Sequence, residues 1–171
     1  MFKKHTYPGV GWLKWVPLVF ISDQLSKWWV LTHLAPYESV SVMPGIQFIL
    51  AQNRGVAFSL FDKHDGSTSG FLLLFILALT LMLLVWLVRT PPAEKWGGIA
   101  LVAILGGALG NGCDRIWHGY VVDFIDLSIG RWHWYTFNIA DSFITVGAVI
   151  MIVTILFFPA VPKEDSVCQK R

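Results

Sequence analysis

Two aspartates near one end of a hydrophobic segment have the residue type and spacing for acid–base catalysis. Asp123 lies in the sequence VVDFIDL and Asp141 lies in NIADS, 18 positions further along the chain. If the intervening chain forms a loop at one membrane surface, the two carboxyl groups can meet. Neighbouring carboxyls share a proton, because repulsion and partial desolvation raise the pKa of one above that of the other. The ionised carboxylate then activates water, while the protonated one polarises a peptide carbonyl.

Other hydrolytic mechanisms have little support in the sequence. The metalloprotease motif H-E-x-x-H, a cysteine cluster and the serine motif G-x-S-x-G are all absent. His118 and His133 have no evident serine partner, and we expect both to be solvated loop residues, as we do Asp114 and Asp126. The residues therefore favour aspartyl-protease chemistry that needs no metal and no cofactor.

Several of the polar residues also have a purely structural interpretation. Asn138 and Asp141 have the spacing of a helix N-cap followed by an acid in the first turn. Asp23 and Lys27 are four residues apart, so they would share one helix face, and we favour a neutralising ion pair over a catalytic role. Arg115 and Lys27, near helix ends, can extend toward lipid headgroups.

The composition is that of an integral membrane protein. The 171 residues are 55% hydrophobic and only 14% charged, which is too apolar for an ordinary soluble domain. A net charge of +2, carried by scattered basic residues, gives little support for nucleic-acid binding. Cys113 is expected at the end of a spanning segment and Cys168 in the C-terminal tail, and a position at opposite faces of the membrane would argue against a disulfide between them.

Four apolar segments are long enough to span a bilayer. An uncharged run of 18 helical residues rises about 27 Å, close to the roughly 30 Å of hydrocarbon. The first segment contains Asp23 and Lys27 and is followed by no small-residue cleavage site, so we interpret it as an uncleaved span rather than a signal peptide. The third is rich in glycine, which suits close approach between helices. The predicted spans in one membrane domain are residues 12–31, 71–88, 96–113 and 139–158.

The distribution of basic residues predicts the orientation of the spans. Eight lysines and arginines lie on the side of the two termini and four lie on the opposite side, so both termini are expected in the cytoplasm. The outer loops are then residues 32–70 and 114–138. In the first, Pro44 and Gly45 indicate a turn between two segments with loosely alternating polarity, which predicts a small sheet on the membrane. The second is crowded with tryptophan and tyrosine, which favour the interface.

This topology brings the polar residues of distant segments to one place. Lys27, Asn111, Arg115 and Asp141 all fall near the outer ends of predicted spans, while Asn53 and Asp123 lie in the outer loops. The predicted site therefore lies at the boundary of the outer leaflet.

Five segments of the chain, in this order, resemble those of bacterial lipoprotein signal peptidases, also called signal peptidase II. Together they cover nearly the whole chain, and five ordered segments are far more specific than any one of them. They are DQLSK at 23–27, QNRGVAFSL at 52–60, GGALGNGCDR at 106–115, VVDF at 121–124 and FNIADS at 137–142.

The resemblance implies an all-α integral membrane protein of four transmembrane helices with a small β-rich extracytoplasmic subdomain. It implies an aspartyl endopeptidase of the bacterial inner membrane, multi-pass, that cleaves prolipoproteins just before a diacylglyceryl-modified cysteine. We expect a monomer whose partners are lipidated prolipoproteins and membrane lipid, with no nucleic acid. Asp123 and Asp141 match the catalytic dyad. The matching site-lining or supporting residues are Asn53, Gly55, Asn111, Arg115, Asn138, Asp23 and Lys27.

Two other functions remain as alternatives. A small proton-coupled transporter could use Asp23, Lys27 and Asp141 as a relay, although the chain lacks repeated, interrupted halves. A non-enzymatic assembly factor could use the aromatic outer loops as a docking surface.

Overall fold

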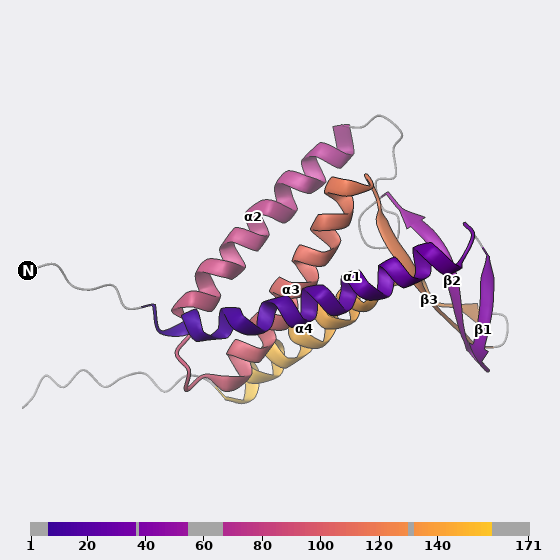
Figure 1. The fold of residues 1–171 in the computed structure, drawn as a ribbon. Coiled ribbons are helices and arrows are strands. Elements are labelled where there is room, and N and C mark those ends of the chain that lie inside the picture. The colour runs from indigo at the N-terminus through magenta and orange to yellow at the C-terminus, as the bar shows by residue number, and fades with distance from the viewer. Residues whose placement is uncertain (1–6, 37, 55–66, 130–131, 159–171) are drawn as a thin grey trace, which may run out of the picture.

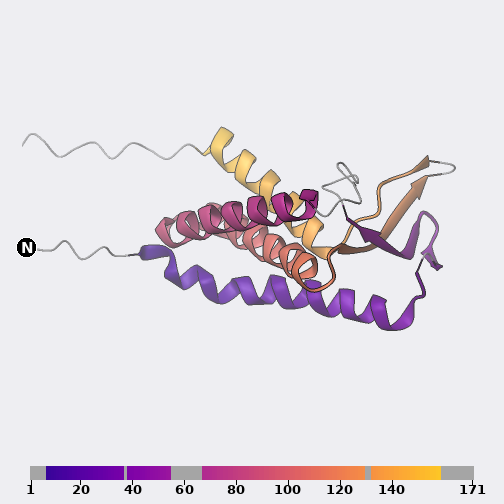
Figure 2. The same cartoon turned by 90° about the horizontal axis from the view of Figure 1, so that it is seen from above.

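The computed structural model describes residues 7–36, 38–54, 67–129 and 132–158, and these form a helical bundle with a small sheet at one end (Figure 1). In the view of Figure 2 the sheet again lies beyond one end of the helices, and η1 and the end of α4 lie toward the other. The elements are η1 (Pro8–Trp15), α1 (Val16–His33), β1 (Ser39–Met43), β2 (Ile46–Asn53), α2 (Ser67–Arg89), α3 (Lys95–Trp117), β3 (Val121–Ile129), β4 (Trp132–His133) and α4 (Ile139–Phe157).

Helix α3 is the centre of the bundle and packs against each of the other three α-helices. Its glycines permit this, because a side chain would collide with a neighbour. A Cβ atom at Gly107 would lie 2.6 Å from the carbonyl oxygen of Ala140, and one at Gly106 would lie 2.5 Å from Cβ of Val19. The close approach predicted from the glycine content is therefore confirmed.

The sheet is antiparallel, with strand order β1-β2-β3-β4 among the described residues. β1 and β2 form the predicted hairpin, and Gly45 in its turn has φ +85°, a conformation that favours glycine. Strand β3 was not predicted. Its pairing with β2 joins the two predicted outer loops, and Ala51 pairs with Asp123. This pairing is what brings Asp123 next to the first loop.

Among the described residues, two hydrophobic clusters hold the elements together. One joins α1, α2 and α3 away from the sheet; its buried members are Val16, Val19, Leu83, Leu87, Leu101, Val102 and Leu105. The other joins the end of α1 to the sheet, through Val30, Leu34, Leu50, Val122 and Phe124. Because Val122 and Phe124 flank Asp123, the second cluster fixes that part of β3 against α1.

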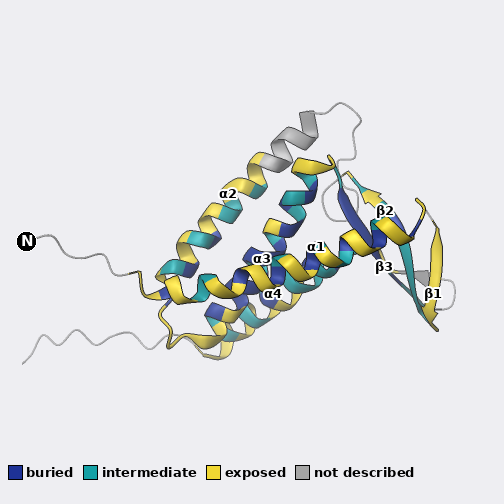
Figure 3. Cartoon of the chain, viewed as in Figure 1, coloured by how far each residue is buried: buried dark blue, intermediate teal, exposed yellow. Residues whose placement is uncertain are grey.

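The outward-facing sides of the helices are largely exposed (Figure 3), and many of the exposed residues are large and apolar. Leu74, Leu81, Val149 and Leu156 are all more than half exposed, an arrangement that suits contact with lipid rather than water. Within the described residues, α3 and α4 are long and apolar enough to cross a membrane, and Leu74–Arg89 of α2 is a shorter apolar stretch. Crossing by all four helices remains a prediction.

The structure corrects two expectations about acidic residues. α3 continues past residue 113 to Trp117, so Asp114 lies in a helix and is only 2% exposed. Asp126 lies in β3, is 5% exposed and accepts a hydrogen bond from Gln47. The expectation that both are solvated loop acids was wrong, because the helix is longer than its uncharged run and the second loop contains an unpredicted strand.

Candidate active site

Asp123 projects from β3 and is almost completely buried, with 3% of its surface exposed. Both of its carboxyl oxygens accept hydrogen bonds from side-chain amides. Asn53 Nδ2, from the end of β2, donates to Oδ2 at 2.9 Å, and Asn138 Nδ2 donates to Oδ1 at 2.6 Å. Three segments that are far apart in sequence therefore meet at this carboxyl.

Asp141 lies in the first turn of α4 and forms a capping box with Asn138. Asn138 Oδ1 accepts from the backbone N–H of Asp141 at 2.9 Å, and Asp141 Oδ2 accepts from the backbone N–H of Asn138 at 3.3 Å. The predicted N-cap is confirmed. The same Asn138 side chain reaches Asp123, so capping the helix and connecting the two aspartates are functions of one residue.

Asn111 of α3 completes the connection between the aspartates. Its Nδ2 donates to Asp141 Oδ1 at 2.8 Å, while its Oδ1 accepts from Asn138 Nδ2 at 3.1 Å and from Lys27 Nζ at 2.9 Å. With two donors on its oxygen, the amide has one orientation in which every polar atom is paired. That orientation directs its nitrogen at Asp141.

The surroundings give Asp123 an unusual affinity for a proton. Burial, followed by the nearby charge of Asp141, raises the pKa of Asp123 to about 7, although the amides of Asn53 and Asn138 act in the opposite direction. Asp141 is only half-buried. The arrangement thus provides one carboxyl that holds its proton up to about neutral pH, beside a second one that is more accessible.

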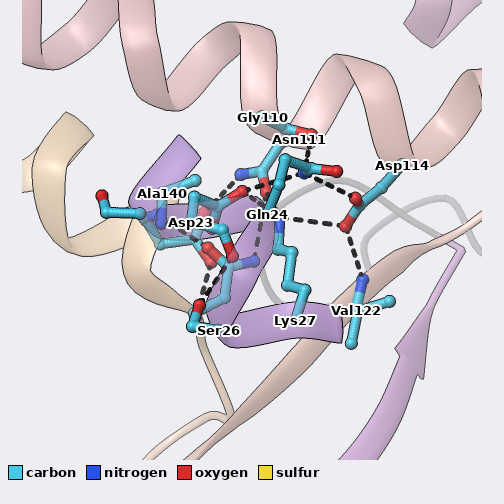
Figure 4. A network of polar contacts seen from close by, with 12 residues as sticks. Asp23, Gln24, Ser26, Lys27, Gly110, Asn111, Asp114, Val122 and Ala140 are labelled. Atoms are coloured by element: carbon cyan, nitrogen blue, oxygen red, sulfur yellow. Dashed lines mark hydrogen bonds and ion pairs between the residues drawn. The ribbon is translucent and has the colours of Figure 1, made fainter. Parts of the chain in front are cut away.

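A buried ionic network (Figure 4) is connected to the pair through Asn111, which accepts from Lys27 and donates to Asp141. Lys27 Nζ lies 2.8 Å from Asp23 Oδ2, so the predicted ion pair is confirmed, and 2.9 Å from Asp114 Oδ2. Gln24 Nε2 donates to Asp114 Oδ1 at 3.1 Å and to Asp23 Oδ2 at 3.2 Å. The three charged side chains are at most 2% exposed.

Sequence reasoning missed Asp114 and Gln24. Asp114 stands three positions after Asn111, a spacing that places both on one side of a helix, and extending the predicted helix by one turn would have identified it. Gln24 offered no comparable signal, because its role depends on α1 lying beside α3.

Two predicted site residues, Arg115 and Gly55, remain to be placed. Arg115 is half-buried on α3, and its charge interacts with Asp123, Asp141 and Asp114. Gly55 lies outside the described residues. Asn53, Asn111 and Asn138 therefore each form a hydrogen bond with a member of the aspartate pair. Lys27 is connected to Asp141 through Asn111, and Asp23 pairs with Lys27.

Comparison with known proteins gives one consistent result. Residues 15–157 match the family described as signal peptidase (SPase) II. The chain is similar to the lipoprotein signal peptidase of Serratia proteamaculans (strain 568), with 41% identity over 166 residues that cover 97% of this chain and 98% of the relative. It is also similar to the lipoprotein signal peptidase of Shewanella sp. (strain MR-4), with 43% identity and 92% of each chain covered.

The fold is similar to solved structures of a bacterial membrane enzyme obtained by the in meso method. One, at 1.9 Å resolution, has a TM-score of 0.76 and 27% identity and covers 87% of this chain and 95% of its own. Another, at 2.3 Å, has a TM-score of 0.78 and 28% identity and covers 93% and 96%.

Proposed function

The chain belongs to the signal peptidase II family and cleaves the signal peptides of prolipoproteins as an aspartic peptidase, and we propose that Asp123 and Asp141 are its catalytic dyad. This activity replaces the transporter and the assembly factor that the sequence left as alternatives. One observation carries the assignment of the dyad. Asn138 hydrogen-bonds to both aspartates, so a single amide sets their relative position.

The two carboxyls have different tasks in the proposed reaction. Asp141 carries the negative charge, which is stabilised by the donated hydrogen bonds and by the N-terminus of α4. It takes a proton from water, whose oxygen attacks the carbonyl carbon of the scissile peptide bond. Asp123 gives its proton to the carbonyl oxygen, so a neutral tetrahedral diol forms.

Collapse of the diol restores both carboxyls. The carbon–nitrogen bond breaks as Asp141 transfers the proton taken from water to the leaving nitrogen. Asp123 recovers its proton from the hydroxyl that becomes the new carboxyl group of the product. One water molecule is consumed, one peptide bond is cleaved and the dyad returns to its starting protonation.

A set of asparagine variants tests the dyad. Effects within one catalytic unit are not additive, so Asp123→Asn, Asp141→Asn and the double variant should each lose turnover by similarly large factors, about 10³ or more. The assay is cleavage of a lipidated prolipoprotein by purified, membrane-inserted protein. Turnover close to that of the wild type in either single variant would eliminate that residue from the dyad.

We infer which peptide bond of the substrate is cleaved from the depth of the dyad in the membrane. Asp123 belongs to β3 and Asp141 to the first turn of α4, and the start of α4 lies at the end of the bundle that carries the sheet (Figure 1). In our proposed topology this end faces outward, with both termini in the cytoplasm and all four helices spanning the inner membrane. A diacylglyceryl-modified cysteine would hold its neighbouring peptide bond at this depth, and we place the cut just before that cysteine.

Arg115 is the residue that we assign to contact with the lipidated segment. Its charge lies close to both members of the dyad, and its position near the end of α3 suits the glyceryl ester region. Asn53 is less suited to this contact, because its amide nitrogen already donates to Asp123.

Paired substrates test the recognition of lipid. The wild type should cleave an unlipidated, membrane-inserted prolipoprotein far more slowly than the lipidated form, and Arg115→Ala should reduce that discrimination. The measurement is the ratio of kcat/KM for the two substrates in the same detergent. Equal cleavage of both by the wild type would mean that the acyl chains do not position the scissile bond.

A further inference from the structure

A buried carboxylate that the proposed reaction does not use holds the chain directly before one catalytic residue. Asp114 Oδ2 accepts a hydrogen bond from the backbone N–H of Val122 at 3.0 Å and pairs with Lys27 Nζ at 2.9 Å. Val122 immediately precedes Asp123. The bond crosses from α3 to the start of β3, so it fixes the point at which the strand leaves the bundle.

A second carboxylate holds the chain directly before the other catalytic residue. Asp23 Oδ1 accepts from the backbone N–H of Ala140 at 2.9 Å, and its Oδ2 pairs with Lys27 Nζ at 2.8 Å. Ala140 immediately precedes Asp141. Its N–H belongs to the first turn of α4, where a helix offers no acceptor of its own.

Lys27 joins these two contacts into one unit (Figure 4). We infer that Asp114 is a positioning residue of the reaction: Asp23, Lys27 and Asp114 form a carboxylate clamp that sets the separation of the dyad through the peptide N–H before each aspartate. The inference rests on the dyad proposed above. Through Asn111 Oδ1, the same lysine also orients the amide that donates to Asp141.

Packing leaves the clamp little freedom to move. Its three side chains are at most 2% exposed, and a Cβ atom at Gly110 would collide with Oδ2 of Asp23. A buried ionic group of this kind contributes little net stability, since the desolvation of its charges offsets their attraction. A role in geometry accounts for burying three charges beside the dyad better than a role in stability does.

The decisive experiment compares two substitutions of the same residue. Asp114→Asn removes the charge but keeps an oxygen that can accept from Val122, whereas Asp114→Ala removes the acceptor. A displacement of about 1 Å at a catalytic group costs about 10²-fold in rate, so kcat of Asp114→Ala should fall by about 10–100-fold, with KM changed by less than about threefold. The loss of kcat in Asp114→Asn, expressed as a logarithm, should be at most about half of the loss in Asp114→Ala.

Two controls separate positioning from other causes. Leu83→Ala creates a cavity in the buried cluster of α1, α2 and α3, so it lowers stability without touching the clamp. Its kcat per folded molecule should equal that of the wild type. Asp123→Asn in the same assay tests the dyad itself: if that variant keeps its turnover, the proposed dyad fails, independently of the result for Asp114.

Three results would overturn the clamp while leaving the dyad intact. They are a wild-type kcat in Asp114→Ala, a loss of kcat that only follows the loss of folded protein, and equal losses in Asp114→Asn and Asp114→Ala. Should Asp114→Ala fail to fold, Asp23→Asn and Asp23→Ala repeat the comparison at the N–H of Ala140, with the same criteria.

Discussion

The amide nitrogen of Asn138 lies 2.6 Å from Oδ1 of Asp123, so the residue that caps α4 is also a hydrogen-bond donor to β3. One side chain therefore joins two elements that each carry an aspartate. Its capping function can be performed by several residue types, but its link to Asp123 requires a donor on a side chain of this length.

Substitution of Asn138 should separate stability from activity. Both substitutions remove the hydrogen bonds that the Asn138 side chain donates, but Asn138→Ser keeps a good N-cap, so it should be more stable than Asn138→Ala by about 1 kcal/mol. Both should lose most of their turnover, because neither donates to Asp123. Thermal unfolding in detergent and cleavage of a lipidated prolipoprotein provide the two measurements. A fully active serine variant would show that the cap alone matters.

The protonation of Asp123 should appear in the pH dependence of the rate. Its pKa of about 7 implies that the dyad loses its shared proton as the pH rises above neutrality. We therefore expect kcat to fall on the alkaline side with a midpoint near 7. Measured turnover that stays constant from about pH 6 to pH 9 would contradict Asp123 as the proton donor.

The same group should make stability depend on pH, with a sign set by the raised pKa. Between its ordinary value of 3.8 and about 7, the folded protein holds a proton on Asp123 that the unfolded chain has released. The contribution of Asp123 to the free energy of unfolding therefore falls as pH rises through this window and is constant above it. Asp123→Asn should remove this component, as measured by the difference in Tm between variant and wild type at pH 5 and pH 8.

Asp126 provides a test of which acid in β3 is catalytic. Its carboxylate accepts from Gln47, and an asparagine can still accept from that donor, so Asp126→Asn should keep turnover within about threefold of the wild type. The variant also serves as a control for the removal of a buried negative charge near Asp123. A loss as large as that of Asp123→Asn would mean that the wrong acid has been assigned.

The glycines of α3 should differ in their tolerance of alanine. A methyl group at Gly107 would lie 2.6 Å from a backbone oxygen of α4, which cannot move without shifting the helix, so Gly107→Ala should cost about 1–3 kcal/mol. At Gly112 the nearest atom, Cγ2 of Ile76, is 3.4 Å away, and Gly112→Ala should be tolerated. Thermal unfolding compares the two, and equal destabilisation would argue against close packing of α3 on α4.

Contacts between residues that lie close together in the chain could be predicted from the amino-acid sequence. The spacing of four residues between Asp23 and Lys27 predicted the ion pair, and the spacing of three residues between Asn138 and Asp141 predicted the helix cap. The glycines of the third apolar segment indicated close packing. Each of these follows from the fixed geometry of one helix, so it can be derived without knowledge of any other element.

Contacts between groups that lie far apart in the chain could not be predicted in this way. Asp114 was dismissed as a solvated acid because its partners, Lys27 and the N–H of Val122, lie on α1 and β3. The contact of Asn53 with Asp123 likewise depends on the pairing of β2 with β3, across about 70 residues of intervening chain. Spacing along one helix can place Asp114 on the same side as Asn111, but it does not identify partners on other elements, since those depend on how helices and strands pack against one another. That packing also gives Asp123 its buried, proton-retaining environment.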